Sequence, residues 1–424
     1  MVHSVGMRDV VRTVLSTTAA RAAGLAGFVA WLTLGCSALS DFEGLTGAHK
    51  LDASDDGGGT DAGHDADAAD ALDTDAGHDV IDDVIDDVDA DDAAADADAC
   101  AAPSGTPVLM ARTAGSAWTM TVDETRVYWT VQDYPAADGG NLRSALLMAD
   151  RACCGTSCEQ ILAVFDASSL SDIAADDEWV YVGVLGEPDK GRVVRVEKST
   201  GDVKVLAAGQ SQPFGLVVDN THVYWTDWKE GALRLALKTA SWQDGGPETA
   251  DTVAAGLTSP GFLRRDPNTK QLFWLSTTAR TLSRCYPSFA GNDASCTPTV
   301  MSESPSTQGE AWGLAVDDAW VYWREGMDPA GTVRRVSKLV ATPTPSTLLA
   351  DGEIALGPRW IDVDDEYVYW TNKNLGQVAR LSKSSDAGVP DVWASVAGAH
   401  TCVVADDAVF VASWANGEVY RIPK

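Results

Sequence analysis

The side chains that could carry chemistry are few, and the clearest are charged residues that interrupt apolar segments. Asp172 and Asp362 stand where related segments of the chain have Ala, Val or Leu, and Arg264 and Arg265 stand in a third such segment. Charges are rarely buried without a partner. We therefore expect these side chains to face a water-filled channel, with an arginine near the carboxylates. As a functional site, Asp172 and Asp362 would be metal ligands or acid and base groups.

His400 and Cys402 form a second candidate, because residues two apart on a strand share a face. One interpretation is a Cys–His nucleophile, and the other is a core cysteine beside a histidine at a channel mouth. The sequence has no Gly-x-Ser-x-Gly, P-loop, Gly-x-Gly-x-x-Gly or His-Glu-x-x-His motif. We therefore predict no catalytic residue, no resident metal and no cofactor.

A short apolar segment with central aromatic residues recurs about every 47 residues, which indicates a repeat architecture. Each copy has the β-branched and aromatic residues of a buried strand. The seven copies are Val127-Tyr128-Trp129, Val180-Tyr181-Val182, Val223-Tyr224-Trp225, Leu272-Phe273-Trp274, Val321-Tyr322-Trp323, Val368-Tyr369-Trp370 and Val409-Phe410-Val411.

Each repeat contains four strand-like segments, a to d, and the recurring segment is strand b. An Asp four residues before strand b, for example Asp317, suits a tight a–b turn in which its side chain accepts hydrogen bonds from backbone amides. Strand c follows the pattern Gly-x-[Val/Leu]-x-x-x-x-Lys, which starts at Gly191, Gly231, Gly331, Gly376 and Gly417.

Four-stranded units of this length predict an all-β fold, a seven-bladed β-propeller over residues 101–424, with six blades as the alternative. The last repeat ends at Lys424 without a strand d. The spare segment from Pro107 to Arg112 is expected to supply it. This would join both ends of the domain and protect an open sheet edge.

The segment Val223-Tyr224-Trp225-Thr226-Asp227 resembles the Tyr-Trp-Thr-Asp repeat of low-density-lipoprotein-receptor-type propellers. The whole unit is similar to bacterial lipoprotein propellers related to the TolB-like and NHL groups. The resemblance covers about residues 107–424, but only one copy keeps all four letters. It implies a propeller that binds proteins or peptides. Lactonase-like propellers use an inner-strand acidic cluster with Ca²⁺, and this chain lacks their full Glu/Asn/Asp set.

Large side chains recur at the start of strand a, five residues before the turn Asp, where propellers present the mouth of their channel. Such rings offer a stacking surface for sugars or peptide side chains, although packing between blades is the alternative. The candidate ligand-binding residues are Trp118, Phe214, Trp312, Arg359, Trp360 and His400; Ser171, Gly261 and Phe262 fall in or beside the same positions.

Residues 1–36 have the organisation of an export signal, with a positive start and the apolar run from Ala22 to Gly35. The sequence from Leu32 to Cys36 resembles the lipobox of bacterial lipoproteins, in which the cysteine is lipidated. Lipidation at Cys36 would anchor the chain to a membrane. Ser37 indicates the outer membrane, with the periplasm and the cell surface both open. A plain secretory signal is the alternative.

Residues 37–100 form a linker with 20 Asp, one Glu and one Lys. Such a segment cannot bury enough apolar surface to offset its ordering entropy, so we expect a disordered, extended tether. Calcium binding by its Asp clusters is the weaker alternative, because the spacing of a calcium loop is absent. The net charge of −31 predicts no nucleic-acid partner.

Eight cysteines in an exported chain predict disulfides. Cys285 and Cys296 flank the c–d hairpin of the fourth repeat and are expected to pair. Cys158 should pair with Cys153 or Cys154, and the other of these could reach Cys100. Cys402 is left as a buried thiol. A zinc site at residues 153, 154 and 158 lacks further ligands.

Together these features predict a monomeric, membrane-anchored lipoprotein of the cell envelope. Its propeller is expected to bind a protein, peptide or glycan through the aromatic mouth. The alternative is a metal-dependent hydrolase or lyase of the lactonase-like kind, built on Asp172 and Asp362.

Overall fold

The computed structural model describes residues 102–135, 142–153, 155, 158–166, 169–186, 190–240, 250–290, 293–303, 311–326, 331–339, 344, 346–352, 360–384 and 389–424. The predictions for residues 1–36, including Cys36, and for the linker 37–100 lie outside these residues. The described part of the chain contains no helix long and apolar enough to cross a membrane.

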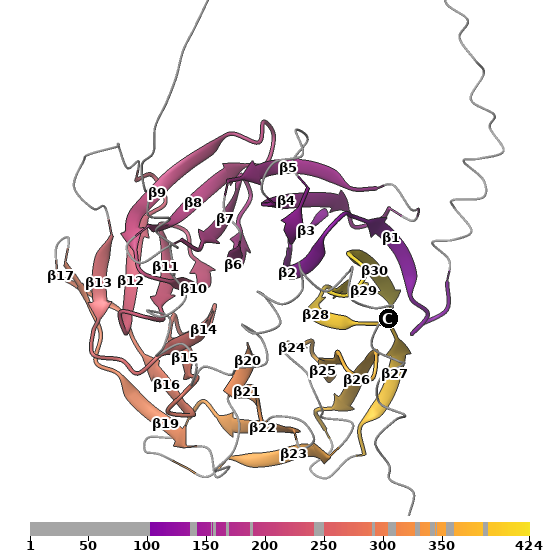
Figure 1. Ribbon diagram of the computed structural model, residues 1–424. Helices are drawn as coiled ribbons and strands as arrows, with labels where there is room; N and C mark the ends of the chain where they lie inside the picture. The colour runs from indigo at the N-terminus through magenta and orange to yellow at the C-terminus, as the bar shows by residue number, and fades with distance from the viewer. Residues whose placement is uncertain are drawn as a thin grey trace, which may run out of the picture.

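Seven four-stranded antiparallel sheets are arranged in a ring around a common axis, which confirms the seven-bladed β-propeller and shows that six blades is wrong (Figure 1). In each blade, strand a lies innermost and strand d outermost. The inner strands are β2 (Ser116–Val122), β6 (Leu170–Ala175), β10 (Pro213–Val218), β14 (Pro260–Arg265), β20 (Ala311–Val316), β24 (Ile361–Val363) and β28 (Ala399–Val404).

Strands b and c follow outward. Strands b are β3 (Arg126–Tyr134), β7 (Trp179–Val184), β11 (His222–Asp227), β15 (Leu272–Ser276), β21 (Trp320–Glu325), β25 (Tyr367–Asn372) and β29 (Ala408–Ser413). Strands c are β4 (Arg143–Asp150), β8 (Gly191–Glu197), β12 (Ala232–Leu237), β16 (Thr281–Cys285), β22 (Gly331–Ser337), β26 (Gln377–Ser382) and β30 (Glu418–Pro423). Gly231, Gly376 and Gly417 open their strands c with φ between 62° and 69°, a left-handed conformation that favours glycine.

The outer strands complete the blades, and one blade carries an extra hairpin. Strands d are β5 (Gln160–Phe165), β9 (Val203–Gln210), β13 (Asp251–Ala254), β19 (Thr299–Glu303), β23 (Thr347–Gly352), β27 (Asp391–Ser395) and β1 (Val108–Arg112). The hairpin of β17 (Ser288–Ala290) and β18 (Asp293–Ser295) lies between β16 and β19.

The ring is closed by β1, which pairs with β30 as the outer strand of the last blade. Leu109 lies opposite Tyr420, and Arg112 lies opposite Glu418 and forms a 2.6 Å ion pair with it. The prediction that a segment before the first repeat supplies the missing strand is therefore confirmed. Closure of this kind covers the edge of β30 and completes the fourth strand of the last blade.

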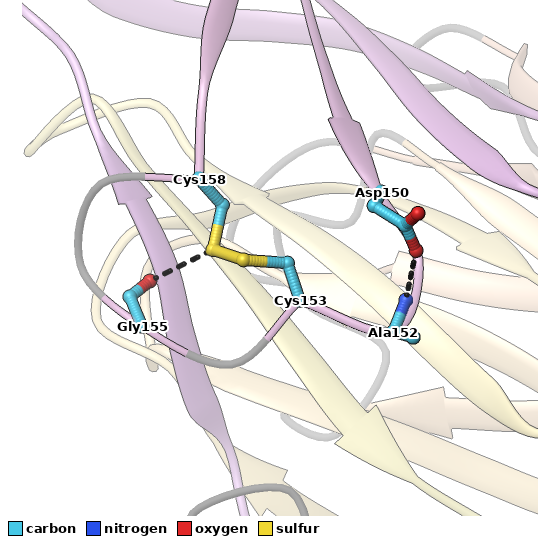
Figure 2. The surroundings of a disulfide bond; sticks show 5 residues. All are labelled: Asp150, Ala152, Cys153, Gly155 and Cys158. Atoms are coloured by element: carbon cyan, nitrogen blue, oxygen red, sulfur yellow. Dashed lines mark hydrogen bonds between the residues drawn. A yellow bond between two sulfur atoms is a disulfide. The ribbon is translucent and has the colours of Figure 1, made fainter. Parts of the chain in front are cut away.

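Two disulfides occur in the described part of the chain. Cys285 pairs with Cys296 at the base of the extra hairpin, as predicted, with Cα atoms 5.7 Å apart. Cys153 pairs with Cys158, with Cα atoms 6.1 Å apart (Figure 2). The Cys158 amide donates to the Met110 carbonyl of β1. Cys402 is a buried free thiol, as predicted. Cys100 and Cys154 lie outside the described residues.

The recurring strand-b residues form the core between blades. Their largest side chains are almost completely buried, among them Trp129, Trp225, Trp274, Trp323 and Trp370. Burial of such large apolar side chains is the main driving force for folding. It explains why this segment is the most regular part of the repeat.

The turn aspartates also bind their own strand b and the neighbouring blade. Asp317 Oδ1 accepts hydrogen bonds from the amides of Ala319 and Trp320, at 2.8 and 2.7 Å, which closes the a–b turn as predicted. Its Oδ2 accepts from the Tyr322 hydroxyl at 2.9 Å and pairs with Lys383 of the next blade at 2.6 Å. One carboxylate thus holds its own turn, its own strand b and the neighbouring blade.

This contact between blades recurs around the whole ring. The cation is usually the residue directly after strand c of the next blade, and in blade 4, where Tyr286 stands at that position, Arg265 supplies it instead. The pairs are Asp123–Lys198, Asp176–Lys238, Asp219–Arg265, Asp266–Lys338, Asp317–Lys383, Asp364–Lys424 and Asp407–Arg151.

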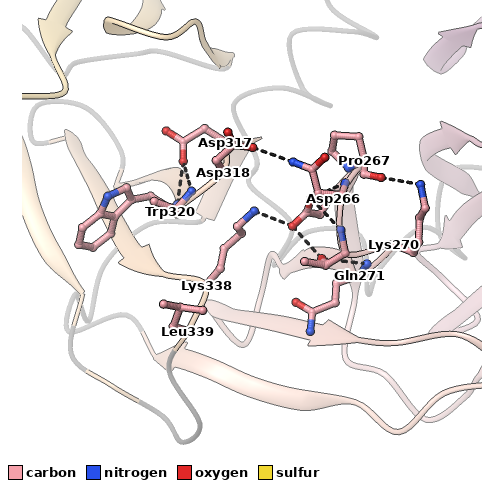
Figure 3. Close-up of polar contacts among 12 residues, drawn as sticks. Asp266, Pro267, Lys270, Gln271, Asp317, Asp318, Trp320, Lys338 and Leu339 are labelled. Atoms are coloured by element: carbon pink, nitrogen blue, oxygen red, sulfur yellow. Dashed lines mark hydrogen bonds and ion pairs between the residues drawn. The ribbon is translucent and has the colours of Figure 1, made fainter.

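The pair between Asp266 and Lys338 is the most enclosed of these, with side chains 1% and 7% exposed and atoms 2.5 Å apart (Figure 3). Burial raises the pKa of Asp266, but hydrogen bonds from Lys338, Thr269 and the Asn268 amide outweigh burial and lower the pKa to about 2. The carboxylate is therefore ionised at neutral pH.

We predict that Lys338→Met lowers the free energy of unfolding by about 3–5 kcal/mol, because it leaves Asp266 buried without its cation. Urea unfolding of the full chain measures this loss. Lys229→Met, at an exposed position, is the matched control and should change stability by less than about 0.5 kcal/mol. A loss below about 1 kcal/mol for Lys338→Met would contradict the role assigned to the buried pair.

Candidate ligand site in the central channel

Aromatic side chains close one end of the channel, at the face where the inner strands begin. Trp118, Phe214, Phe262, Trp312, Trp360 and His400 line one small cavity with Ser171 and Asp172, and we call these six side chains the aromatic plug. The candidate mouth residues therefore meet in the structure. Arg359 lies outside the described residues.

The plug is organised around Phe262, which is 1% exposed. Its ring centroid lies 5.4 Å from that of Phe214, 5.5 Å from that of Trp312 and 5.6 Å from that of Trp360, each in an edge-to-face arrangement. Only about 20 Å³ among the plug residues is open to the centre of a water-sized sphere, which is room for one water molecule. The rings pack against one another, and the space between them is too small for a ligand ring to stack there.

His400 and Cys402 do not form a reactive pair. The His400 ring packs 4.4 Å from that of Trp118, and its Nδ1 lies 3.1 Å from Thr401 Oγ1. Cys402 is completely buried in the core, where burial, and then the charge of Asp362, raises the pKa of its thiol well above the usual value. A nucleophilic thiol needs the opposite shift. The Cys–His interpretation is therefore not supported.

Bulges in the inner strands aim the plug residues at the axis. In the described residues, six of the seven inner strands shift register against strand b near their start, for example between Ala117 and Met120. A bulge redirects side chains and leaves a backbone amide without a ladder partner. Thr226, the third letter of the Tyr-Trp-Thr segment, accepts from the Gly215 amide at 3.0 Å and donates to the Gly261 carbonyl of the next blade.

Beyond the plug, the channel widens toward the face that carries the a–b turns. This concavity, which we call the funnel, has about 340 Å³ open to the centre of a water-sized sphere. Its floor includes Asp172 and Trp360, which also border the plug. Its lining residues are Met120, Thr121, Val122, Asp172, Ile173, Ala174, Ala175, Leu216, Val217, Val218, Arg264, Arg265, Pro267, Trp360, Asp362 and Val403.

Arg264 and Asp362 occupy equivalent positions of two different blades. Each inner strand has one residue paired with the central aromatic residue of strand b. These seven residues are Thr121, Ala174, Val217, Arg264, Ala315, Asp362 and Val403. Five of the seven are uncharged, and the two charged ones have opposite sign. The equivalence of these positions can be read from the sequence by aligning the repeats on that aromatic residue.

Asp172 is extensively hydrogen-bonded. It accepts from the Thr119 hydroxyl at 3.2 Å, from the Ile173 amide at 3.0 Å and from the Leu216 amide of the next blade at 3.3 Å. Burial raises its pKa, and the nearby charge of Arg264 and these hydrogen bonds offset only part of that effect. Its main contacts therefore hold adjacent blades together.

Asp362 resembles Asp172 in reaching the next blade. Its two oxygens accept hydrogen bonds from the amides of Val363 at 2.9 Å and Val404 at 2.8 Å. Burial raises its pKa, and the Val404 amide and the charge of Arg264 counteract this only in part. Among the described residues, no three His, Cys, Asp or Glu side chains come together as metal ligands.

The two arginines of the funnel differ in how they are held. Arg265 lies 3.4 Å from Asp219 and takes part in the ring of ion pairs. Arg264 donates to the Leu263 carbonyl at 2.8 Å and lies 3.7 Å from Asp172, with 27% of its side chain exposed. In the described part of the chain, these contacts use only some of its five donors. Arg264 beside Asp172 confirms the expectation of an arginine near the inner carboxylates.

We predict that Phe262→Ala lowers the free energy of unfolding by about 3–5 kcal/mol, because it removes the central ring of the plug and leaves a cavity. Urea unfolding compares it with Tyr286→Ala, at a position 57% exposed, which should cost less than about 0.5 kcal/mol. Equal stability of the two variants would show that the rings of the plug are not packed against one another.

Comparison with known proteins supports the fold. No protein-family model matches the sequence. A selenomethionine-substituted virginiamycin B lyase from Staphylococcus aureus is 12% identical with a TM-score of 0.53, over 73% of this chain and 95% of that chain. A streptogramin B lyase structure is 12% identical with a TM-score of 0.52, over 74% and 95%. A catalytically inactive form of the S. aureus enzyme with quinupristin is 10% identical with a TM-score of 0.51, over 75% and 98%. At this identity the likeness shows a shared propeller fold alone.

Proposed function

We propose that this propeller is a binding module that takes part of a protein, peptide or glycan into the funnel. The observation that carries the proposal is the funnel itself, a concavity of about 340 Å³ lined by apolar side chains and a few converging charged ones. Ligand sites in proteins have this character. The inner strands that bear these residues are held by the ring of ion pairs, and a rigid scaffold favours recognition.

The funnel is a better candidate than the aromatic plug, on which the sequence-based hypothesis rested. The plug residues pack against one another with room for one water, whereas the funnel is open. In this proposal Trp360 contributes to the floor of the site, and the remaining plug rings support it from below. Trp118, Phe214 and Trp312 are partly exposed, but the space between the rings is too small to admit a ligand ring.

A metal-dependent hydrolase or lyase has weaker support. The carboxylates it would use, Asp172 and Asp362, accept backbone amides of neighbouring blades, and Asp172 also lies near Arg264. These contacts leave few oxygen lone pairs directed at a common point. The three solved structures named above are lyases, but that activity belongs to those proteins, and fold similarity does not transfer it.

We further propose that the propeller is exported and held at the outer membrane by a lipid on Cys36, with residues 37–100 as an acidic tether. Two disulfides in the described part of the chain support a location outside the cytoplasm, because disulfides persist in oxidising compartments. Whether the propeller faces the periplasm or the cell surface, it would act there as a monomer.

A thermal-shift screen of the full chain against peptides and envelope glycans tests the binding proposal. A ligand at about 100 times its dissociation constant should stabilise the folded state by roughly 2.7 kcal/mol. The variant Thr121→Trp places a large ring in the funnel and should abolish the shift. A shift that survives Thr121→Trp would exclude the funnel as the site, and no shift with any peptide or glycan would contradict binding of these ligand classes.

The anchoring proposal is tested by Cys36→Ala in cells. We expect the unsubstituted chain in the membrane fraction, because the lipid supplies the attachment, and the variant in the soluble fraction. Cys402→Ala, which removes a buried thiol outside the signal, is the matched cysteine control and should stay with the membrane. Membrane retention of Cys36→Ala would contradict lipidation at this residue.

A further inference from the structure

We propose that the ligand of the funnel is a zwitterion with an apolar body, a free amino acid or short peptide, whose carboxylate binds Arg264 and whose ammonium group binds Asp362. The inference rests on the proposed function and names the chemistry of that same site. It starts from the equivalent positions described above, where Arg264 and Asp362 are the two charged members of a seven-residue layer.

Arg264 is the group suited to a carboxylate. Its hydrogen bond to the Leu263 carbonyl and its 3.7 Å approach to Asp172 leave part of the guanidinium fork directed at the funnel, and 27% of the side chain is exposed. Guanidinium groups bind carboxylates through two parallel hydrogen bonds. The neighbouring Arg265 is less available, because it pairs with Asp219.

Asp362 is the group suited to an ammonium ion. Its hydrogen bonds come from two backbone amides, which are uncharged donors. Lys424, whose charge also reaches Asp362, pairs with Asp364 at 2.7 Å. In the described part of the chain no cation forms an ion pair with Asp362, and burial raises its pKa, an effect that the Val404 amide and the charge of Arg264 counteract only in part. A ligand ammonium group would supply the missing cation.

The surroundings select a ligand that carries both charges. Ala315 holds the equivalent position of the blade that stands between those of Arg264 and Asp362. An anion at Arg264 would meet the repulsion of Asp362, and a cation at Asp362 would meet that of Arg264. A zwitterion satisfies both groups at once. The rest of the wall includes Leu216, Val217 and Val403, which suit an apolar side chain.

Isothermal titration calorimetry of the full chain tests the proposal with matched probes. L-Leucine and leucyl-leucine carry both charges, isocaproate carries the carboxylate alone and isoamylamine carries the ammonium group alone. We expect at least one zwitterion to bind tenfold or more tightly than either singly charged probe, and the two zwitterions distinguish an amino acid from a short peptide. Equal affinity of zwitterion and singly charged probes would overturn the inference.

Two variants locate the charges. Arg264→Gln and Asp362→Asn should each weaken zwitterion binding at least tenfold, while Asp391→Asn, on an outer strand with its side chain 64% exposed, should leave it unchanged. Circular dichroism checks that each variant is folded, and the probe comparison on the unsubstituted chain needs no variant. If a peptide or glycan binds in the funnel but neither zwitterion does, the zwitterion inference is wrong and the proposed function stands. If nothing binds, both are wrong.

Discussion

The carboxylate at each a–b turn is the contact on which the ring depends. It pairs with a cation of the next blade, in six blades it accepts hydrogen bonds from the turn amides, and in five of these also from the tyrosine of strand b. Where the cation follows strand c, its backbone amide is bonded to the a–b turn of its own blade, as Lys338 is to Ala319. Each interface between neighbouring blades, which we call a seam, is therefore tied to the turns on both sides of it. Because the last blade pairs with the first through Asp407 and Arg151, the network has no free end.

A closed ring of this kind makes the channel a fixed frame. The inner strands cannot separate without breaking seams, so their bulges hold side chains at constant positions around the axis. The threonine of the Tyr-Trp-Thr segment stabilises the bulge by bonding the amide that the bulge frees. Blade 2 differs, because Gly183 replaces the threonine, and the Ser171 hydroxyl occupies the space where a Cβ would lie and donates to the Gly183 carbonyl at 3.3 Å. The plug and the funnel are consequences of this frame.

Much of the fold could be predicted from the sequence, because the same strand pattern occurs in each repeat and each copy supports the assignment of the others. The number of blades, the closing strand and the pairing of Cys285 with Cys296 were all predictable from spacing. The seam contacts were not, although both partners belong to recognised patterns: the Asp opens the turn and the Lys ends strand c. Their meeting depends on how neighbouring blades pack. The closeness of the plug rings escaped prediction for a similar reason, since a linear pattern places Phe262 near the mouth without showing that other rings fill the space around it.

The most informative residues are those where a blade departs from the repeat. Neighbouring blades pack in a similar way all around the ring, so similar residues are expected at equivalent positions. The uncharged members of the seven-residue layer, such as Ala315, fit this expectation. Arg264 and Asp362 do not, and placing charge near an apolar wall costs free energy. Departures from local rules concentrate at functional sites in natural proteins. Blade 4 departs twice, because Arg265 also replaces the usual cation of strand c. The two arginines of blade 4 and the carboxylate of blade 6 therefore place positive and negative charge on different sides of the funnel. A ligand with two oppositely charged ends matches this arrangement.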